Sequence, residues 1–354
     1  MEPLNLHEIE RAALERLPSM AGDYYRSGSR DEATLAANRR AFERWGLLHH
    51  VLVDVSERST ATTLLGHRVA SPIVVAPTAF HKLAHPDGEA ATARGTHTLF
   101  TLSTLSTTPV EEVVAAAGCP VLFQLYVTRD RGACAALIER VLEAGVAGIV
   151  LTADAAVLGT RERDVRNGFR LPDGLRMPNI AVNGGDLGGA AGSSALATWV
   201  RDTLDASLTW SDLDWLLERV NVPVVLKGVV RADDARRAVD HGVAAVQVSN
   251  HGGRQLDGGV ATLDALPGVV DAVAGRCEVW LDGGVRRGTD VLKALALGAN
   301  AVAVGRPALW GLAIDGADGV ASVLRLLESE LDEAMALAGT PTLAHVDRSL
   351  VARH

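Results

Sequence analysis

The chain alternates between short apolar runs and longer segments in which apolar residues recur with helical spacing. Eight runs are apolar at consecutive positions, which is typical of strands buried on both faces of a parallel sheet. They are residues 73–77, 100–104, 121–126, 148–154, 222–227, 244–249, 278–283 and 301–305. Amphipathic segments accompany them at 86–98, 109–117, 129–144, 210–220, 231–241, 262–274, 287–297 and 317–338. This alternation predicts an α/β fold with a parallel sheet.

The regular spacing of these units favours a closed barrel. Eight strand–helix units are what a (β/α)8 barrel, or TIM barrel, requires, and a doubly wound open sheet is the structural alternative. A length of 354 residues suits one such barrel with extensions, so we expect a single domain over residues 1–354. Residues 1–45 look helical and precede the barrel, with Asp23-Tyr24-Tyr25 in a polar, glycine-flanked turn.

Residues 155–209 interrupt the alternation between the fourth strand and its helix. The middle of this excursion, residues 183–194, consists mainly of glycine and other small residues. A long loop of this kind is either an active-site lid or a mobile excursion without a role, and the sequence leaves both readings open.

Composition narrows the class of protein. Apolar residues make up 48% of the chain, enough for a large core, and the net charge of −9 argues against a nucleic-acid or anionic-membrane partner. The three cysteines, Cys119, Cys134 and Cys277, match no metal-binding spacing and suggest a reducing cytoplasm. The first residues lack the pattern of a secretory signal, and no apolar run reaches the roughly 18 residues of a membrane span.

Polar residues end each apolar run, where a barrel of this kind carries its active site. The strand ends supply Pro77, Thr78, Ala79, Ser103, Gln124, Tyr126, Thr152, Asp154, Lys227, Ser249, Asp282, Gly283, Gly284 and Gly305. Lys227 directly ends an apolar run, which is unusual because burying an ammonium group without a partner is costly. Arg286 and Arg306, beside the glycines after the last two strands, indicate a phosphate site, with ordinary turns and surface arginines as the alternative.

The sixth run ends in Ser249-Asn250-His251-Gly252-Gly253-Arg254. Arginine can hold a carboxylate bidentately, and histidine can take a proton from the neighbouring carbon or its hydroxyl. The two glycines allow a tight turn and leave room for a planar ligand. Taken alone, the segment could be a polar turn. Beside the other strand ends, it favours the oxidation of an anionic substrate.

The motifs that carry a family resemblance extend over nearly the whole chain. They are Asp23-Tyr24-Tyr25, Ala76-Pro77-Thr78-Ala79, Phe123-Gln124-Leu125-Tyr126, Leu226-Lys227-Gly228, residues 249–257, residues 282–288 and Gly305-Arg306-Pro307. On these motifs the chain resembles the FMN-dependent α-hydroxy acid oxidase/dehydrogenase family, which includes glycolate oxidase, lactate oxidase and mandelate dehydrogenase. The resemblance implies FMN as the cofactor.

The resemblance also implies a role for each polar strand end. His251 resembles the family's catalytic base, and Asp154 resembles the carboxylate that pairs with its imidazolium. Lys227 resembles the cation beside the flavin ring that stabilises its anionic reduced form. Tyr126 resembles a catalytic residue that contacts the substrate hydroxyl and so also binds the substrate. The remaining roles are substrate binding by Tyr24, Arg161 and Arg254, and FMN binding by Pro77, Thr78, Ala79, Ser103, Gln124, Thr152, Ser249, Asp282, Gly283, Gly284, Arg286, Gly305 and Arg306.

One position departs from the glycolate-oxidising members. They carry an aromatic residue two positions after the serine of the second strand, where this chain has Leu105. Leucine leaves a differently shaped apolar wall, so we expect a substrate with a larger side chain than glycolate, branched or aromatic. Phe80 is interpreted as packing beside the site, and His81 and His85 as solvated loop residues.

These implications define an expected reaction. An (S)-2-hydroxy acid is oxidised to the 2-oxo acid, with O2 as the simplest electron acceptor and H2O2 as its product, although another acceptor is possible. The sequence does not decide between loss of the α-hydrogen as a proton and as a hydride. The family resemblance implies a homo-oligomer, commonly a tetramer. The alternatives are an FMN-dependent isomerase and a non-catalytic flavin- or phosphate-binding barrel.

Overall fold

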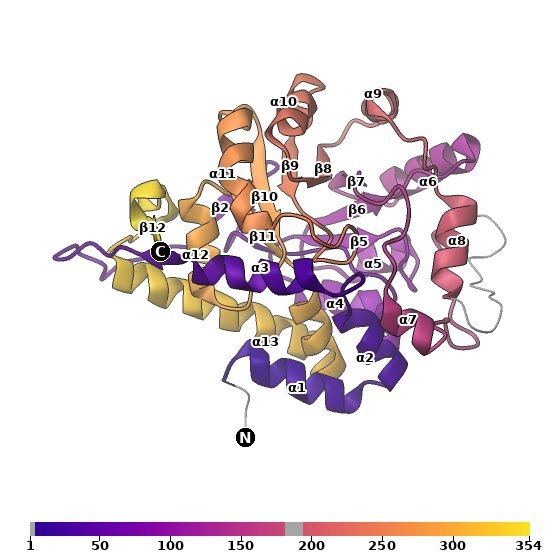
Figure 1. The fold of residues 1–354 in the computed structure, drawn as a ribbon, viewed down its shortest axis with the longest axis horizontal. Helices are drawn as coiled ribbons and strands as arrows, with labels where there is room; N and C mark the ends of the chain where they lie inside the picture. The colour runs from indigo at the N-terminus through magenta and orange to yellow at the C-terminus, as the bar shows by residue number, and fades with distance from the viewer. Residues whose placement is uncertain (1–3, 181–193) are drawn as a thin grey trace.

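Eight parallel strands close into a barrel in the computed structural model, which describes residues 4–180 and 194–354. Around the barrel they are β4 (Ile73–Val75), β5 (Phe100–Ser103), β6 (Val121–Leu125), β7 (Gly148–Thr152), β8 (Val224–Val229), β9 (Ala245–Val248), β10 (Glu278–Asp282) and β11 (Ala301–Val304), and β11 pairs with β4 (Figure 1). The predicted (β/α)8 barrel is confirmed, and the doubly wound alternative is wrong.

The barrel strands are buried along almost their whole length, as their consecutive apolar residues predicted. Inward-pointing side chains fill the barrel; Trp280 is the largest of them and is 1% exposed. The parallel register places Ser103 beside Gln124 and Thr152 beside Lys227. The polar strand ends therefore meet at one rim of the barrel.

Helices surround the barrel close to the predicted positions. They are α4 (Gly88–Gly95), α5 (Val110–Ala116), α6 (Arg131–Glu143), α9 (Trp210–Leu217), α10 (Ala232–Asp240), α11 (Thr262–Val273), α12 (Gly288–Ala296) and α13 (Arg306–Ala338). Helix α13 begins well before the predicted 317–338 and contains a break at Asp315 and Gly316. Its first part is buried on most sides, so it lacks the amphipathic spacing by which the other helices were found.

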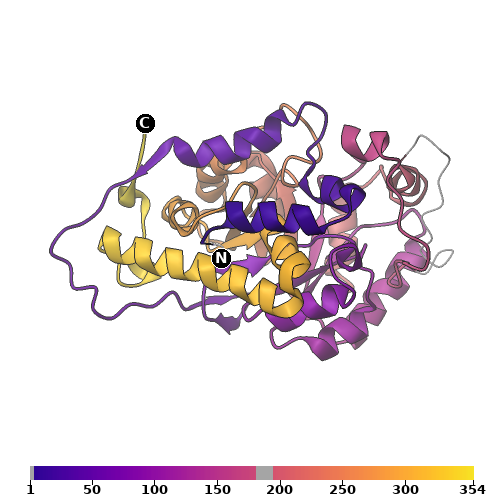
Figure 2. The ribbon, with the colours of Figure 1, turned by 90° about the horizontal axis from the view of Figure 1, so that it is seen from below.

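Three helices precede the barrel, as predicted for residues 1–45. They are α1 (Leu6–Arg16), α2 (Ser19–Arg26) and α3 (Ala33–Glu43), and α1 lies along α13 (Figures 1 and 2). The predicted turn at Asp23-Tyr24-Tyr25 is wrong, because these residues belong to α2. Tyr24 and Tyr25 are buried, and Tyr24 stacks on Phe169 with 4.3 Å between the ring centroids. Packing of these rings favours the helix despite the neighbouring glycines.

Short strands and loops complete the chain. Strand β1 (Trp45–Leu47) pairs with β12 (Val351–Arg353), and β2 (Thr62–Leu64) pairs with β3 (His67–Val69). The 155–209 excursion contains α7 (Glu162–Arg166) and α8 (Ala195–Thr203), so it is not a plain loop. The glycine-rich middle lies outside the described residues, apart from Ser194, which caps α8. Neither described part of the chain has a helix long and apolar enough to cross a membrane.

The expectation for His81 is wrong. This side chain is fully buried, and its ring nitrogens contact Thr78 Oγ1 at 2.6 Å and Thr92 Oγ1 at 2.8 Å. Burial lowers its pKa below the ordinary histidine value. His85 is half-buried rather than solvated. Phe80 packs as expected, fully buried with its ring 5.4 Å from that of Tyr24.

Candidate active site

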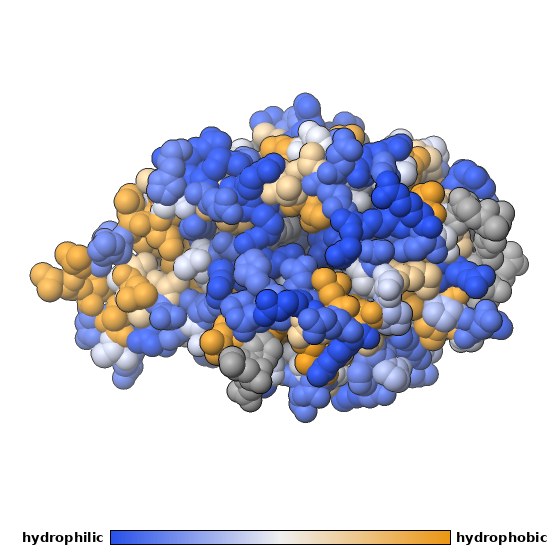
Figure 3. All heavy atoms as spheres, turned by 60° about the horizontal axis from the view of Figure 1, so that its bottom comes forward, coloured by the Kyte–Doolittle hydropathy of each residue, from blue (hydrophilic) through white to orange (hydrophobic). Residues whose placement is uncertain are grey.

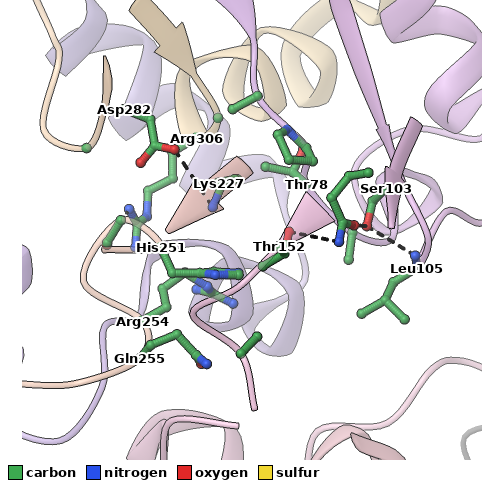
Figure 4. A pocket seen from close by; sticks show the side chains of 18 of the residues that line it. Thr78, Ser103, Leu105, Thr152, Lys227, His251, Arg254, Gln255, Asp282 and Arg306 are labelled. Atoms are coloured by element: carbon green, nitrogen blue, oxygen red, sulfur yellow. Dashed lines mark hydrogen bonds and ion pairs between the residues drawn. The ribbon is translucent and has the colours of Figure 1, made fainter. Parts of the chain in front are cut away.

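A cavity opens at the C-terminal rim of the barrel and encloses about 1160 Å³ of space, including its mouth (Figure 4). Most of the residues predicted for the site meet there. They are Tyr24, Pro77, Thr78, Ala79, Ser103, Leu105, Gln124, Tyr126, Thr152, Arg161, Lys227, His251, Arg254, Asp282, Gly283, Gly284, Arg286, Gly305 and Arg306. Asp154 and Ser249 do not line the cavity but contact residues that do.

His251 and Asp154 form a pair across the β9 and β7 strand ends. Asp154 Oδ1 lies 2.9 Å from His251 Nδ1, and the two side chains are 19% and 13% exposed. This contact fixes Nδ1 as the donor and leaves Nε2 as an acceptor. The backbone of His251 has a φ of +59°, a strained value for a residue with a side chain, and its N–H donates to Ser249 Oγ.

The charges around this pair act on it in opposite directions. Burial and the nearby Lys227 lower the pKa of His251, while the Asp154 carboxylate opposes them. Burial alone would raise the pKa of Asp154, but His251 and Lys227 outweigh it and hold that pKa below the ordinary value. The imidazole is therefore a neutral acceptor beside an ionised carboxylate, which suits a general base.

Lys227 is a buried cation beside this base. Its side chain is 5% exposed, and Nζ lies 3.8 Å from Asp282 Oδ2. Asp282 is fixed in turn, because it accepts hydrogen bonds from Gln247 Nε2 at 2.6 Å and Ser249 Oγ at 2.8 Å. The ammonium group is thus balanced by a carboxylate and lines the cavity.

Arg254 and Arg161 both line the cavity but differ in their hydrogen bonding. Arg254 Nη1 donates to the carbonyl oxygens of Tyr24 and Ser27 at 2.7 and 2.8 Å, which anchors it to the end of α2. Burial lowers the pKa of Arg254 to about 10, so it stays protonated near neutral pH. Arg161 is 5% exposed, and its Nε and Nη1 have no hydrogen-bond partner among the described residues. Asp164, a buried carboxylate, lies 3.9 Å from Arg161 Nη1.

The other side of the rim presents an amide, hydroxyls, glycines and arginines. Gln124 links its neighbours: Ser103 Oγ donates to its oxygen at 3.2 Å, and its nitrogen donates to Thr152 Oγ1 at 3.0 Å. Gly284 has a φ of +89°, and a Cβ there would lie 2.4 Å from the carbonyl oxygen of Asn38. Glycine is required there by both conformation and space.

Arg286 and Arg306 complete that side. Arg306 donates from Nε, Nη1 and Nη2 to the carbonyl oxygens of Tyr25, Gly252 and Ser27. Arg286 lies over the Trp310 ring, 4.6 Å from its centroid, and burial lowers its pKa to about 10. Burial and repulsion by Arg254 and Arg286 lower the pKa of Arg306 well below its ordinary value.

Among the cavity residues without a predicted role, two groups stand out. Leu196, Val200 and Leu204, on and just after α8, form an apolar wall of the cavity, which Leu105 also lines. Their spacing of four marks one helix face and could have revealed them. Gln255 lies in the β9 motif that sequence reasoning quoted, but it received no role there. Its contacts lie in a distant segment of the chain, so no local signal pointed to it.

The arrangement fits a flavin mononucleotide. The repulsion among the buried guanidinium groups would be relieved by an anion such as the phosphate. The Pro77-Thr78-Ala79 wall and the Gln124 amide would face the flavin ring, and Lys227 would lie close to it. The fold and site together define a class of protein, an oxidoreductase barrel that uses FMN.

The sequence places the chain in the same class. It matches the model of the family described as FMN-dependent dehydrogenase over residues 13–353. The chain belongs to this family, and FMN is its cofactor. It is 51% identical to an L-lactate oxidase of Nostoc sp. over 357 residues, which cover 99% of this chain and 98% of the relative. It is 49% identical to glycolate oxidase 3 of Arabidopsis thaliana, with 99% and 96% covered.

Solved structures give the same picture. A mandelate oxidase crystallised with (S)-4-hydroxymandelic acid superposes with a TM-score of 0.95 at 42% sequence identity, covering 99% of each chain. A second structure of mandelate oxidase has a TM-score of 0.91 at 40% identity, with 100% of this chain and 99% of the other covered.

Proposed function

We propose that this protein is an FMN-dependent 2-hydroxy acid oxidase, which converts an (S)-2-hydroxy acid and O2 into the 2-oxo acid and H2O2. One observation carries the proposal: His251, paired with Asp154, shares a cavity with Arg161, whose buried Nε and Nη1 have no hydrogen-bond partner in the described part of the chain. A base beside a cationic group with unused hydrogen-bond donors suits a substrate that bears both a carboxylate and a removable proton. The lactate, glycolate and mandelate oxidase relatives support the reaction class.

Binding and orientation fall to the arginines and Tyr24. The substrate carboxylate binds Arg161 and Arg254, whose guanidinium carbons lie 5.8 and 4.9 Å from the Tyr24 ring centroid. Binding supplies the Arg161 donors with acceptors and removes the cost of leaving them buried and unpaired, about 1–3 kcal/mol for a group of this kind. The 2-hydroxy group then lies within the reach of Tyr126 and His251.

Proton transfer falls to His251. Nε2 accepts the proton, and the Asp154 carboxylate stabilises the imidazolium that forms. Burial and the Asp154 charge raise the pKa of Tyr126, so its hydroxyl stays protonated and can donate a hydrogen bond to the substrate oxygen. When bound, FMN supplies the acceptor for the two electrons that leave the substrate. Lys227, a buried cation that lines the cavity, would stabilise the negative charge of the reduced flavin.

The substrate side chain would be larger than that of glycolate. Leu105 and the α8 wall of Leu196, Val200 and Leu204 line the cavity with apolar groups, and we assign them to the pocket for the substrate side chain. Steady-state kinetics on glycolate, lactate, 2-hydroxyoctanoate and mandelate test this proposal. We expect higher kcat/KM on a branched, long-chain or aromatic acid, and a clear preference for glycolate would contradict it.

The same panel tests the reaction. Run in air with peroxide detection, it should yield one H2O2 per 2-oxo acid. Production of 2-oxo acid only with an added quinone or carrier protein would retain the oxidation but exclude O2 as the acceptor. Binding of FMN without any 2-oxo acid would point to the isomerase or the non-catalytic barrel.

A homo-oligomer, with the tetramer as the family expectation, is part of the proposal. The segment after β1 projects from the barrel (Figure 2) and exposes Leu48, Val51, Leu52 and Val53, with Leu52 fully exposed. Apolar atoms gather at that end of the molecule (Figure 3), and such patches mark interaction surfaces. Size-exclusion chromatography with light scattering tests it: Leu52→Asp should dissociate the oligomer, and a monomeric wild type would contradict it.

The proposal also includes a cytoplasmic location for the protein. Cys119, Cys134 and Cys277 are free thiols in the structure, and burial raises the pKa of Cys119 and Cys277 to about 11. Unpaired, unreactive thiols suit a reducing compartment. Cell fractionation followed by immunoblotting tests this location.

A further inference from the structure

Gln255 lies beside Arg254 at the edge of the cavity (Figure 4), and its side chain joins the loop after β9 to the loop after β7. It is 8% exposed, and its Nε2 donates to the carbonyl oxygens of Asp154 at 2.9 Å and Val157 at 2.8 Å. Its Oε1 accepts from the N–H of Gly159 at 2.9 Å. One amide group thus binds three backbone groups of the segment 154–159, and both its nitrogen and its oxygen are engaged.

Gly159 brings the two loops into direct contact. A Cβ at this position would lie 2.4 Å from the carbonyl oxygen of Arg254 and 2.6 Å from that of Gln255. These are backbone atoms, which cannot turn aside as a flexible side chain could. The close approach of Gly159 and the hydrogen bonds of Gln255 are separate observations, and both hold segment 154–159 against the β9 loop.

The residues on either side of this contact belong to the site. Segment 154–159 begins with Asp154, the partner of His251, and leads two residues later to Arg161. On the β9 loop, Gln255 directly follows Arg254. The contact therefore fixes Asp154 relative to His251, and it fixes Arg161 relative to Arg254, the other arginine proposed to bind the substrate carboxylate.

We propose that Gln255 is a positioning residue that keeps Asp154 and Arg161 aligned with His251 and Arg254. The inference rests on the proposed function, since it assigns Gln255 to the proton transfer and carboxylate binding of that reaction. Gln255 acts through the backbone of segment 154–159. Its effect should therefore appear both in substrate affinity, through Arg161, and in the titration of His251, through Asp154.

A purely structural role would give a different pattern, and the chain offers a matched control. Asn179 is also a buried amide, 1% exposed, that accepts from the N–H of Val110 and donates to the carbonyl oxygen of Thr108. Asn179 does not line the cavity. Loss of either amide should lower thermal stability, but only loss of Gln255 should alter the site.

The first test compares Gln255→Leu with Asn179→Leu, both saturated with FMN. Gln255→Leu should raise KM about tenfold or more, because Arg161 is no longer aligned with Arg254. In the pH profile of kcat/KM, it should also shift the acid limb, where kcat/KM rises with pH, to lower pH. His251 is faced by Asp154, which raises its pKa, and by Lys227 and Arg161, which lower it, so a displaced Asp154 leaves a lower pKa. Asn179→Leu should leave both KM and the acid limb unchanged.

Gly159→Ala provides a second route that keeps the glutamine. The added methyl group would press on the backbone of Arg254 and Gln255, and it should reproduce the rise in KM and the shifted acid limb. Gly118→Ala is its control, because a Cβ there has nothing within 4 Å. If Gln255→Leu fails to fold, this pair of variants decides.

The outcomes separate the two proposals. If Gln255→Leu keeps the wild-type KM and the wild-type pH profile, the proposed role of Gln255 is wrong. If only Gly159→Ala folds, the same result in that variant leads to the same conclusion. In either case the oxidase activity of the wild type stands. A wild type that oxidises no 2-hydroxy acid overturns the proposed function, and the inference with it.

Discussion

The two halves of the barrel rim are held together differently. On the β7–β9 half, which carries Asp154, Arg161, His251 and Arg254, some buried polar atoms have no hydrogen-bond partner within residues 4–180 and 194–354: Arg161 Nε and Nη1, and Asp154 Oδ2. On the β10–β11 half, which carries Asp282 to Arg286, Gly305 and Arg306, all three nitrogen positions of Arg306 donate to backbone carbonyls.

This difference separates what the fold supplies from what a ligand must supply. The β10–β11 half is shaped by backbone contacts and glycines that the protein itself fixes. The β7–β9 half keeps buried donors that an anionic substrate would satisfy, and leaving them unpaired costs free energy until it binds. We therefore expect substitutions in the β10–β11 half to lower the affinity for FMN. Substitutions in the β7–β9 half should instead change KM and kcat.

His251→Gln should have the largest effect. Glutamine is polar and similar in length, but it cannot accept the proton at Nε2, so kcat should fall roughly 100-fold or more with FMN retained. Steady-state kinetics and the flavin absorbance of the purified variant measure the two quantities. Near-wild-type kcat would remove His251 from its role.

Asp154→Asn should come next, with kcat about tenfold to 100-fold lower, because the imidazolium loses its carboxylate. The pH profile gives the sharper readout. Asp154 raises the pKa of His251. In the proposed reaction the neutral form of His251 accepts the proton. Removing the carboxylate lowers that pKa, so kcat/KM should begin to rise at lower pH than in the wild type. A shift to higher pH would contradict the assignment.

Arg254→Lys should raise KM about tenfold and leave FMN affinity unchanged. An ammonium group keeps the charge but cannot reproduce the planar fork that binds a carboxylate and the α2 carbonyls together. KM for the preferred acid and the Kd of FMN for the apoprotein should be measured side by side. Loss of FMN with an unchanged KM would contradict the assignment of the β7–β9 half to substrate binding.

Arg286→Leu should show the opposite pattern at a smaller scale. FMN should bind about five- to tenfold more weakly, as expected for one lost charge-assisted contact, while KM stays the same at saturating FMN. Fluorescence titration of the apoprotein with FMN measures the affinity. Arg325→Leu is the control, because Arg325 is an exposed residue of α13 that does not line the cavity.

The sequence predicted the barrel and most of the site because both depend on local signals. Buried parallel strands are apolar at consecutive positions, and the C-terminal strand ends of a barrel meet at one rim, so Lys227, His251 and Asp282 could be placed together. The motifs of the resemblance then supplied the roles that we propose for them.

The errors arose where distant segments decide the outcome. His81 lies in a stretch that looks polar, but its ring is fully buried, in contact with Thr92 on α4 and 6.1 Å from the Phe100 ring on β5. Tyr24 lies between glycines, but packing against Phe169 keeps it helical. Gln255 contacts a segment about 100 residues away in sequence. No periodicity within a short window reports such contacts.

The most direct test of the central claim is anaerobic mixing of the FMN-loaded wild type with an (S)-2-hydroxy acid, followed by the visible flavin absorbance. We expect the yellow band to bleach fully as one equivalent of 2-oxo acid appears, and to return when air is admitted. Retention of the band with every acid of the panel, at concentrations that perturb its spectrum by binding, would contradict the assignment of this site to 2-hydroxy acid oxidation.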